Sequence, residues 1–267
     1  NAVNTLSTKS IAGTNDLHKF LLGDIEAQVK AIWTGLETQY QESFGDTSKS
    51  CGLVLDNSNF YAESGGQMFD TGVISNDKFK FVVDNVQSYG AYVLHTGTLE
   101  SGTITVGDSA LLQVDVDRRR PTMANHTSTH LVNFALRKVV GDGCDQKGSV
   151  VNQNRFRFDF SHNKALTETE LKQLDDVVTN QITREMPVYT QSVPLALAKS
   201  ISGLRAMFGE KYPDPVRVIS VGADLDEVLK TPLDTKWREF SIEFCGGTHL
   251  SNTREAQAFT IVQEEPS

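Results

Sequence analysis

The sequence predicts an α+β protein: a small N-terminal β-barrel-like subdomain followed by an α/β sandwich of helices on a mostly antiparallel sheet. Two observations lead to this fold class. Short β-branched or alternating runs, separated by turn residues, fill residues 51–116 and are typical of a small barrel or a strongly bent sheet. Helical and strand patterns then alternate from residue 122 onward, which favours helices packed on one face of a sheet.

Residues 1–50 are expected to form a helical connector. Between Leu17 and Phe44, apolar residues recur at helical spacing and helix breakers are few. The residues that follow this spacing are Phe20, Leu21, Ile25, Val29, Ile32, Trp33 and Leu36.

Residues 51–120 are expected to form the glycine-rich barrel subdomain. Alternating or β-branched runs with turn residues between them predict its strands. These runs are Cys51–Leu55, Lys78–Val83, Ala91–His95 and Leu111–Val116. We place the boundary to the next domain near Arg118–Pro121.

Residues 121–267 form the predicted second domain. A helix is expected over Thr122–Val140, where Gly141-Asp-Gly143 stops it. Arg155–Phe160 alternates strictly and predicts a half-buried strand, while Thr167-Glu-Thr-Glu170 fits a capping box that opens a helix ending near Arg184. Two further strands are expected at Val216–Val221 and Ser241–Phe244.

Composition narrows the class of protein. The 267 residues are 39% hydrophobic and 22% charged, as in ordinary globular proteins. No apolar run approaches the roughly 20 residues of a membrane span, and the first residues given do not have the basic-then-apolar layout of a secretion signal. Three cysteines do not make a disulfide framework, so we expect a reducing, cytoplasmic location. Because the chain starts at Asn1, we interpret it as a piece of a longer one.

A net charge of −9 argues against a general nucleic-acid binder, because phosphate contacts need lysine and arginine. A short local patch is still compatible with binding one end of an RNA. The best candidate is Asp117–Pro121, which holds Arg118, Arg119 and Arg120. A solvated turn before the helix explains the same tract equally well.

Two paired motifs carry metal-binding chemistry. His126 and His130 are four residues apart in the predicted helix, so one cation can reach both from one face. Cys245-Gly-Gly-Thr-His249 again spaces two ligands by four, on a glycine-rich turn after a strand. Imidazole and thiolate together suit zinc better than magnesium or calcium.

Each pair alone is weak evidence, since a histidine pair at this spacing is structural in most helices. Together the two pairs indicate one zinc site. Thr127 stands where a metalloprotease helix carries glutamate, which argues against a protease. A nucleobase deaminase would show His-x-Glu and Pro-Cys-x-x-Cys, and neither is present. His18, His95, His162, Cys51 and Cys144 are assigned to core or surface positions.

These residues resemble the editing domain of alanyl-tRNA synthetase and its free-standing relatives of the AlaX type. The likeness spans roughly residues 51–265, and Pro213-Asp-Pro215 is closer to the eukaryotic cytosolic type. The first 50 residues carry no motif of the family. The matching stretches are Phe60–Gln67, Asp70–Gly72, Arg118–Pro121, Asn125–His130, Gln146–Ser149, Arg155–Phe160, Phe208–Tyr212 and Cys245–His249.

The resemblance implies a set of site residues. Zinc would be held by His126, His130, Cys245 and His249, which makes residues 121–267 a zinc-containing editing core. Thr129 would recognise the misattached amino acid, and Gln146 would line the pocket. Beyond the resemblance, we expect Gln146 to help position a water near the zinc. The predicted tRNA contacts are Glu63, Gly65, Gly66, Gln67, Arg118, Arg119, Arg120 and Lys147. A tight turn is an equally good explanation of Gly65 and Gly66.

The implied activity is hydrolytic editing, which removes serine and glycine from the 3′ end of the alanine tRNA. The expected partners are the acceptor end of that tRNA and an aminoacylation core and C-terminal domain of the same polypeptide. Two alternatives stay open: a zinc-stabilised tRNA-binding module without catalysis, and a bridge between a synthetase core and a tail. Four protein ligands would close the zinc site, whereas three would leave room for water. No glutamate or aspartate stands beside the histidine pair in the sequence as an obvious general base.

Overall fold

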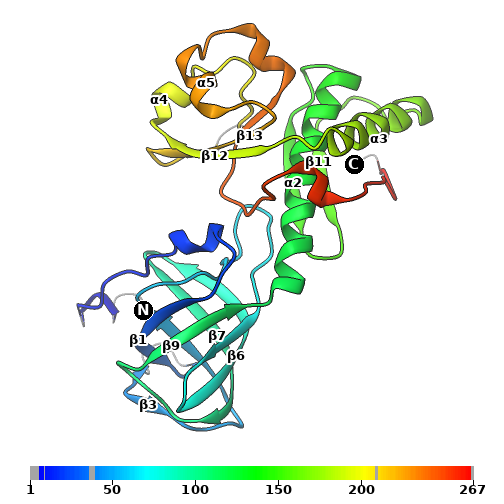
Figure 1. The fold of residues 1–267 in the computed structure, drawn as a ribbon. Helices are drawn as coiled ribbons and strands as arrows, with labels where there is room; N and C mark the ends of the chain where they lie inside the picture. The colour runs from blue at the N-terminus through cyan, green and yellow to red at the C-terminus, as the bar shows by residue number, and fades with distance from the viewer. Residues whose placement is uncertain (1–5, 9, 36–39, 208–209, 266–267) are drawn as a thin grey trace. The chain divides into compact units, whose positions relative to one another are not determined.

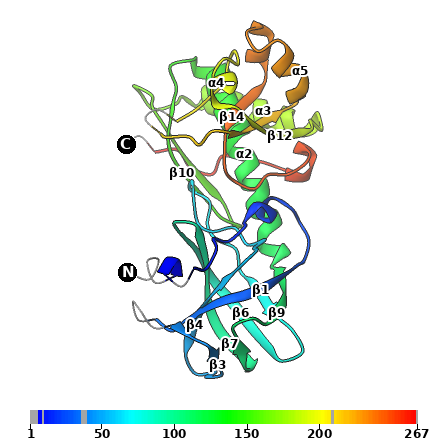
Figure 2. The same ribbon diagram turned by 90° about the vertical axis from the view of Figure 1, so that its left-hand side faces the viewer.

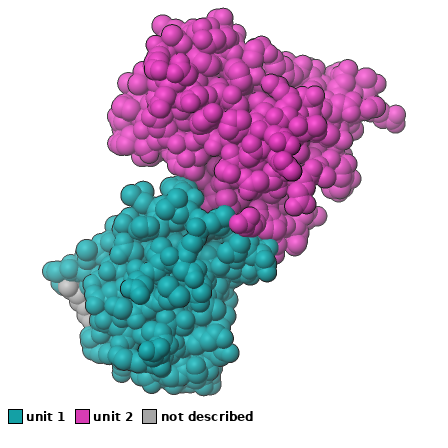
Figure 3. Space-filling view, viewed as in Figure 1, with its two compact units in different colours: residues 1–64, 68–119 teal, residues 65–67, 120–267 magenta. Residues whose placement is uncertain are grey.

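The computed structural model describes residues 6–8, 10–35, 40–207 and 210–265 (Figures 1 and 2). The chain divides into two compact units, residues 1–64 with 68–119 and residues 65–67 with 120–267 (Figure 3). Among the described residues, no helix combines the length and the apolar character needed to cross a bilayer. Leu36, Phe208 and Gly209, which belong to the predicted connector and to one matching stretch, lie outside the described residues.

An antiparallel barrel forms the first unit. Its seven-stranded sheet has the order β2-β1-β4-β7-β6-β5-β9, and β9 pairs again with β1, so all strands except β2 close on themselves. The barrel confirms the predicted first half of the fold. Its elements are β1 (Ile25–Trp33), β2 (Tyr40–Gln41), β4 (Ser50–Leu55), β5 (Gly72–Ser75), β6 (Phe79–Tyr89), β7 (Tyr92–Gly102) and β9 (Ser109–Val114), with a side pair of β3 (Ser43–Phe44) and β8 (Ile104–Thr105).

The predicted helix over residues 17–44 is wrong. Among the described residues of this stretch, which leave out 36–39, the only helical turn is the 3₁₀ helix η1 (Leu17–Phe20), and Ile25–Trp33 is strand β1. The sequence of β1 also alternates, so Ala27 and Val29 are buried in the barrel core, and after an irregularity between Val29 and Ala31 the strand adds Ile32 to the same core. Pairing with β4 and β9 satisfies its backbone on both sides, and this tertiary pairing outweighs the helical spacing.

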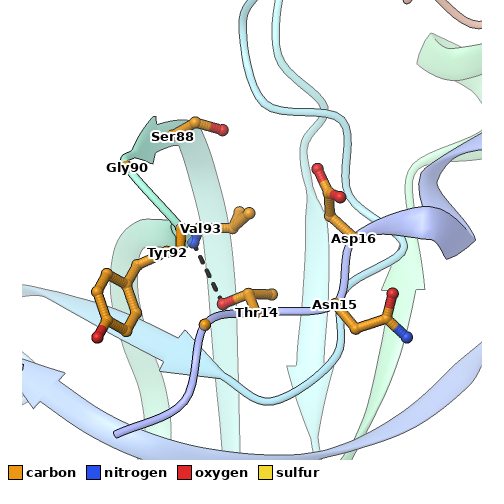
Figure 4. Close-up of a pocket in the computed structure, with 9 residues that line it drawn as sticks. Thr14, Asn15, Asp16, Ser88, Gly90, Tyr92 and Val93 are labelled. Carbon is orange, nitrogen blue, oxygen red and sulfur yellow. Dashed lines mark hydrogen bonds between the residues drawn. The ribbon is translucent and has the colours of Figure 1, made fainter. Parts of the chain in front are cut away.

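Thr14 fastens the N-terminal segment to the barrel. Its hydroxyl donates to the carbonyl of Leu55 at 2.7 Å and accepts from the N–H of Val93 at 3.2 Å (Figure 4). Its own N–H donates to the carbonyl of Ala91 at 2.9 Å. The segment therefore lies against β4 and the start of β7, beside a pocket that Asp16 helps to line.

Helices and small antiparallel sheets build the second unit, as predicted. Buried residues of α2 (Leu131, Leu136) share one core with those of α3 (Leu174, Val178). A second core lies beneath the sheet of order β12-β13-β14. The elements are α2 (Val116–Val140), β10 (Gln146–Val151), β11 (Phe156–Phe160), α3 (Glu168–Thr183), β12 (Val188–Val193), α4 (Leu195–Ala198), β13 (Val216–Val221), α5 (Leu225–Lys230), η2 (Thr235–Glu239), β14 (Ser241–Phe244) and η3 (Thr253–Ala256).

The predicted start of one long helix is confirmed, and that of the other is wrong. The capping box of α3 is confirmed, because Thr167 Oγ1 accepts from Glu170 N and Glu170 Oε2 accepts from Thr167 N. Helix α2 begins at Val116 rather than Thr122, so the arginine tract is helical and Pro121 lies inside the helix. The Asp115 carboxylate accepts from the N–H of Arg118 at 3.2 Å and caps this earlier start.

His95 belongs to the barrel interior, as expected for a histidine without a metal role. Its side chain is fully buried between Leu53 and Ser58: Nδ1 lies 3.1 Å from the Leu53 carbonyl, and Nε2 lies 2.7 Å from Ser58 Oγ. The ring packs edge-on against Phe60, with centroids 5.3 Å apart. Burial lowers the pKa of His95 from 6.5 to about 4, so the folded barrel holds this imidazole neutral.

We expect the barrel to lose stability in mild acid through His95. The folded pKa lies below the unfolded one, so the stabilisation is complete above pH 6.5 and is lost as the pH falls toward 4. The loss should be about 2–3 kcal/mol between pH 7.5 and 4.5. Urea unfolding of wild type and His95→Gln at both pH values measures it, because the other buried histidines titrate in both proteins. Equal pH dependence of the two proteins would contradict the assignment.

Candidate metal centre

Four side chains that can bind a metal converge inside the second unit. They are His126 and His130 on α2, and Cys245 and His249 on the turn after β14. One ligand atom from each lies within 4.8 Å of all the others. The three imidazoles are buried and Cys245 is half-buried, so little of the group is open to solvent.

The distances from the Cys245 sulfur to His126 and His249 are close to those of a tetrahedral zinc site. Cys245 Sγ lies 3.3 Å from Nε2 of His126 and 3.3 Å from Nε2 of His249. Zinc bonds of about 2.0–2.1 Å to nitrogen and about 2.3 Å to sulfur place two such ligands about 3.5 Å apart at the tetrahedral angle. The ring of His249 lies 4.7 Å from those of both His126 and His130, measured between centroids. The donor types of all four residues, and the spacing of Cys245, His126 and His249, therefore fit zinc.

The glycine turn is shaped to bring its two ligands to the helix. A Cβ at Gly247 would lie 2.0 Å from Cε1 of His126, so only glycine fits against that ring. Arg217 Nη1 donates to the carbonyls of Cys245 and Gly247, at 3.0 and 2.8 Å. The guanidinium of a neighbouring strand thus holds the turn in its bent form.

Two of the imidazoles are oriented by oxygen atoms behind them. His126 Nδ1 lies 2.7 Å from Gln67 Oε1, and His249 Nδ1 lies 3.2 Å from Thr127 Oγ1. In both rings this leaves Nε2 directed at the shared centre with Cys245. Such outer partners fix the ring orientation and the tautomer of metal-binding histidines.

The fold brings one acidic residue to the histidine pair, although none stands beside the pair in the sequence. Glu243 on β14 is buried, and its Oε2 lies 3.5 Å from Nδ1 of His130. Burial raises the pKa of Glu243 to about 7, although hydrogen bonds from Asn133 and Ser241 oppose the rise. Sequence spacing did not reveal this residue, because it reaches His130 only through the packing of β14 against α2.

Burial also keeps the cluster uncharged. It lowers the pKa of both His126 and His130 to about 3, and the charge of Arg217 adds to this effect. It raises the pKa of the Cys245 thiol to about 11. Neutral imidazoles are the form that binds zinc, and zinc binding releases the thiol proton.

The two predicted catalytic residues occupy different settings. Thr129 is buried on α2, and its hydroxyl donates to the carbonyl of His126 at 2.7 Å. Gln146 is the half-buried first residue of β10 and pairs with Phe160. Within the described residues, no hydrogen bond joins Gln146 to the four ligand side chains. Its role stays a prediction.

The predicted tRNA contacts in the glycine-rich stretch separate into two groups. Glu63, Gly65 and Gly66 are exposed, and Glu63 accepts from Gln87 Nε2 at 3.0 Å. Gln67 is fully buried against His126 of the candidate metal centre, so the expectation that its side chain contacts tRNA is wrong. The glycine-rich motif predicted that this segment contacts tRNA, but its sequence does not show which side chain points into the interior.

The arginine tract also contains one buried member. Arg119 is 1% exposed, pairs with the carboxylate of Asp70, and donates to the carbonyls of Asn59 and Lys19 at 2.8 Å each. With almost no surface, it cannot contact a phosphate, so we correct its predicted tRNA role to a structural one.

The remaining basic candidates keep exposed surface. Arg118 is half-buried, with its Nη2 donating to the carbonyl of Phe69 at 3.3 Å. Arg120 and Lys147 are exposed. Contact of these three side chains with tRNA stays a prediction.

Known proteins match the chain along its length. A family model of class II (A) tRNA synthetases matches residues 2–118, and a model of the threonyl and alanyl tRNA synthetase second additional domain matches residues 216–267. The chain is 48% identical to the cytoplasmic alanine–tRNA ligase of Dictyostelium discoideum, over 97% of the chain and 28% of that relative.

Two further relatives agree. Identity is 44% to the mitochondrial alanine–tRNA ligase of Saccharomyces cerevisiae and 47% to the alanine–tRNA ligase of Candida albicans, over 97% and 96% of the chain. The chain spans 26% of the length of each. Because the names include cytoplasmic and mitochondrial forms, the cytoplasmic location stays a prediction.

Replacing one ligand should abolish tight zinc binding. We expect His130→Ala to weaken zinc affinity by more than about 100-fold, because even partners behind the ligands contribute about 10–100-fold. The melting temperature in the presence of zinc should fall as well, since metal binding is linked to folding. Elemental analysis and thermal melts measure both, with His18→Ala as the control. A full complement of zinc in His130→Ala would remove this residue from the ligand set.

Proposed function

This chain belongs to the alanyl-tRNA synthetase family, and from that premise we propose that it hydrolyses the ester of a wrongly attached amino acid on the alanine tRNA. The substrates are the seryl and glycyl esters at the 3′ end of that tRNA. The observation that carries the proposal is the buried group of three histidines and one cysteine. An ester is already activated for hydrolysis, so an oriented water and a stabilised oxyanion are sufficient.

The need for such a reaction follows from the size of alanine. A pocket that admits alanine cannot strongly exclude glycine, and it rejects the added hydroxyl of serine only modestly. A second site that hydrolyses the wrong products is the established solution to this kind of problem. The second site must then recognise the hydroxyl that the first site failed to exclude.

Thr129 is the residue we assign to that recognition. Its hydroxyl hydrogen is directed to the carbonyl of His126, which leaves the oxygen as an acceptor. A seryl hydroxyl can donate to this oxygen, and an alanyl methyl cannot. When bound, zinc would supply positive charge that polarises a nearby oxygen. Exposed Arg120 and Lys147 are the side chains we assign to the tRNA phosphates.

A zinc-stabilised tRNA-binding module without catalysis is the second candidate. The observation that favours it is the number of ligands, since four protein ligands make a closed, structural zinc site. The two functions differ in a single measurement, because only the first consumes the aminoacyl ester.

Deacylation of two matched esters tests the leading function. With the zinc-loaded chain in excess over tRNA, we expect the seryl ester of the alanine tRNA to be hydrolysed far faster than the alanyl ester of the same tRNA. Excess enzyme compensates for weak binding by a chain with a net charge of −9. Release of labelled amino acid over time is the readout, and His130→Ala is the control. Equal rates for both esters, or no hydrolysis at any enzyme concentration, would leave only the binding module.

Thr129→Val should reduce the discrimination between seryl and alanyl esters. Loss of one hydrogen bond of about 1–3 kcal/mol corresponds to a fall of roughly 5- to 150-fold in the rate ratio. Zinc content should stay unchanged, because Thr129 is not a ligand. Thr183→Val is a matched control, since that hydroxyl also donates to a helix carbonyl, Thr179 O at 2.9 Å, but on exposed α3 surface. An unchanged ratio in Thr129→Val would exclude Thr129 from recognition.

A further inference from the structure

Gln67 is a polar side chain buried where the glycine-rich stretch reaches the metal centre. It has no exposed surface, unlike its neighbours Gly65 and Gly66. A buried amide needs partners for both its oxygen and its nitrogen, so its hydrogen bonds identify what it does.

These hydrogen bonds connect both halves of the ligand set. Gln67 Oε1 lies 2.7 Å from Nδ1 of His126 on the helix and accepts from the backbone N–H of Thr248 at 2.9 Å. Gln67 Nε2 donates to the hydroxyl of Thr248 at 2.9 Å. Thr248 precedes the ligand His249, so one amide joins the helix ligand to the glycine turn.

The backbone N–H of Thr248 determines which way the amide faces. Turning the amide over would place its NH₂ against that N–H, which are two donors, so Oε1 must face it. The same oxygen faces His126, and an amide oxygen only accepts. His126 must therefore carry its proton on Nδ1. Its Nε2 then carries a lone pair, which is directed toward Cys245 Sγ, 3.3 Å away.

The backbone around the two glycines holds Gln67 in this place. Gly66 has a φ of 83°, and a Cβ there would lie 2.4 Å from the carbonyl oxygen of Ser149. The carbonyl of Gly66 in turn accepts from the N–H of Val151 at 2.8 Å. Glycine is required because the loop packs directly on β10. The tight-turn explanation of these glycines thus has a specific purpose, which is to bring Gln67 inward.

We propose that Gln67 is a positioning residue of the metal centre, which fixes the Nδ1–H tautomer of His126 and ties α2 to the cysteine-bearing turn. This inference rests on the assignment of the four metal ligands. It does not depend on tRNA hydrolysis, so loss of deacylation in any variant leaves it unaffected.

Two substitutions separate positioning from simple packing. Gln67→Met keeps the length of the side chain but offers no acceptor to His126. Gln67→Glu keeps the acceptor oxygen and removes the amide nitrogen. Gln181→Met is the matched control, because Gln181 is another buried glutamine of the same unit, and it donates to the carbonyl of Leu131 at 3.3 Å.

Zinc affinity, measured by competition with a chelator, is the first readout. We expect Gln67→Met to bind zinc about 10–100-fold more weakly than wild type, as partners behind metal ligands typically contribute. Gln67→Glu and Gln181→Met should stay within a few-fold of wild type. Far-UV circular dichroism identifies unfolded variants. Gln67→Asn, whose side chain is one methylene shorter, replaces the methionine variant if that one does not fold.

The tautomer of His126 is the second readout, from ring ¹⁵N chemical shifts of the metal-free protein. Wild type and Gln67→Glu should show a protonated Nδ1, and Gln67→Met should show a mixture of tautomers. Unchanged zinc affinity in Gln67→Met, or an equal loss in Gln67→Met and Gln67→Glu, would overturn the proposal. Wild type that binds no zinc would overturn it together with the ligand assignment.

Discussion

The convergence of three buried histidines and one half-buried cysteine is the constraint on which the second unit depends. Helix α2 supplies two imidazoles from adjacent turns, and the turn after β14 supplies a thiol and a third imidazole. Each of these polar groups costs free energy when it is buried without a partner. The surrounding side chains offset this cost by giving oxygen partners to the outer ring nitrogens of His126 and His249. The same contacts therefore hold the second unit together and position the candidate metal ligands.

Structural features that depend on residues close together in the chain could be predicted from the sequence, because the interactions that form them lie within a few residues. Helical geometry alone places His126 and His130 on one face, and the capping box of α3 is complete within four residues. The strands β13 and β14 have the predicted bounds, Val216–Val221 and Ser241–Phe244. The barrel was also predicted from the short alternating runs of residues 51–116, because turn residues separate them.

Features that depend on contacts between residues far apart in the sequence could not be predicted from it. Strand β1 satisfies both a period of two and a helical spacing, and only its pairing with β4 and β9 decides between them. Glu243 lies beside His130, although their sequence positions are far apart. Arg119 has the same charge as Arg118 and Arg120, yet its ion pair with Asp70 lies in the interior of the first unit. In each case the deciding contact is tertiary, and one sequence does not display it.

The two glycines of the Cys245–His249 turn make unequal demands on the chain. Gly247 lies flat against the imidazole of His126, so any side chain there would force the helix and the turn apart. Gly246 has open space around its Cβ position and does not have a positive φ, so neither steric crowding nor backbone geometry reserves this position for glycine. Substitution at 246 is therefore tolerated by the local packing, whereas position 247 admits no side chain at all. Of the two adjacent glycines in the motif, Gly247 is sterically required and Gly246 is sterically replaceable.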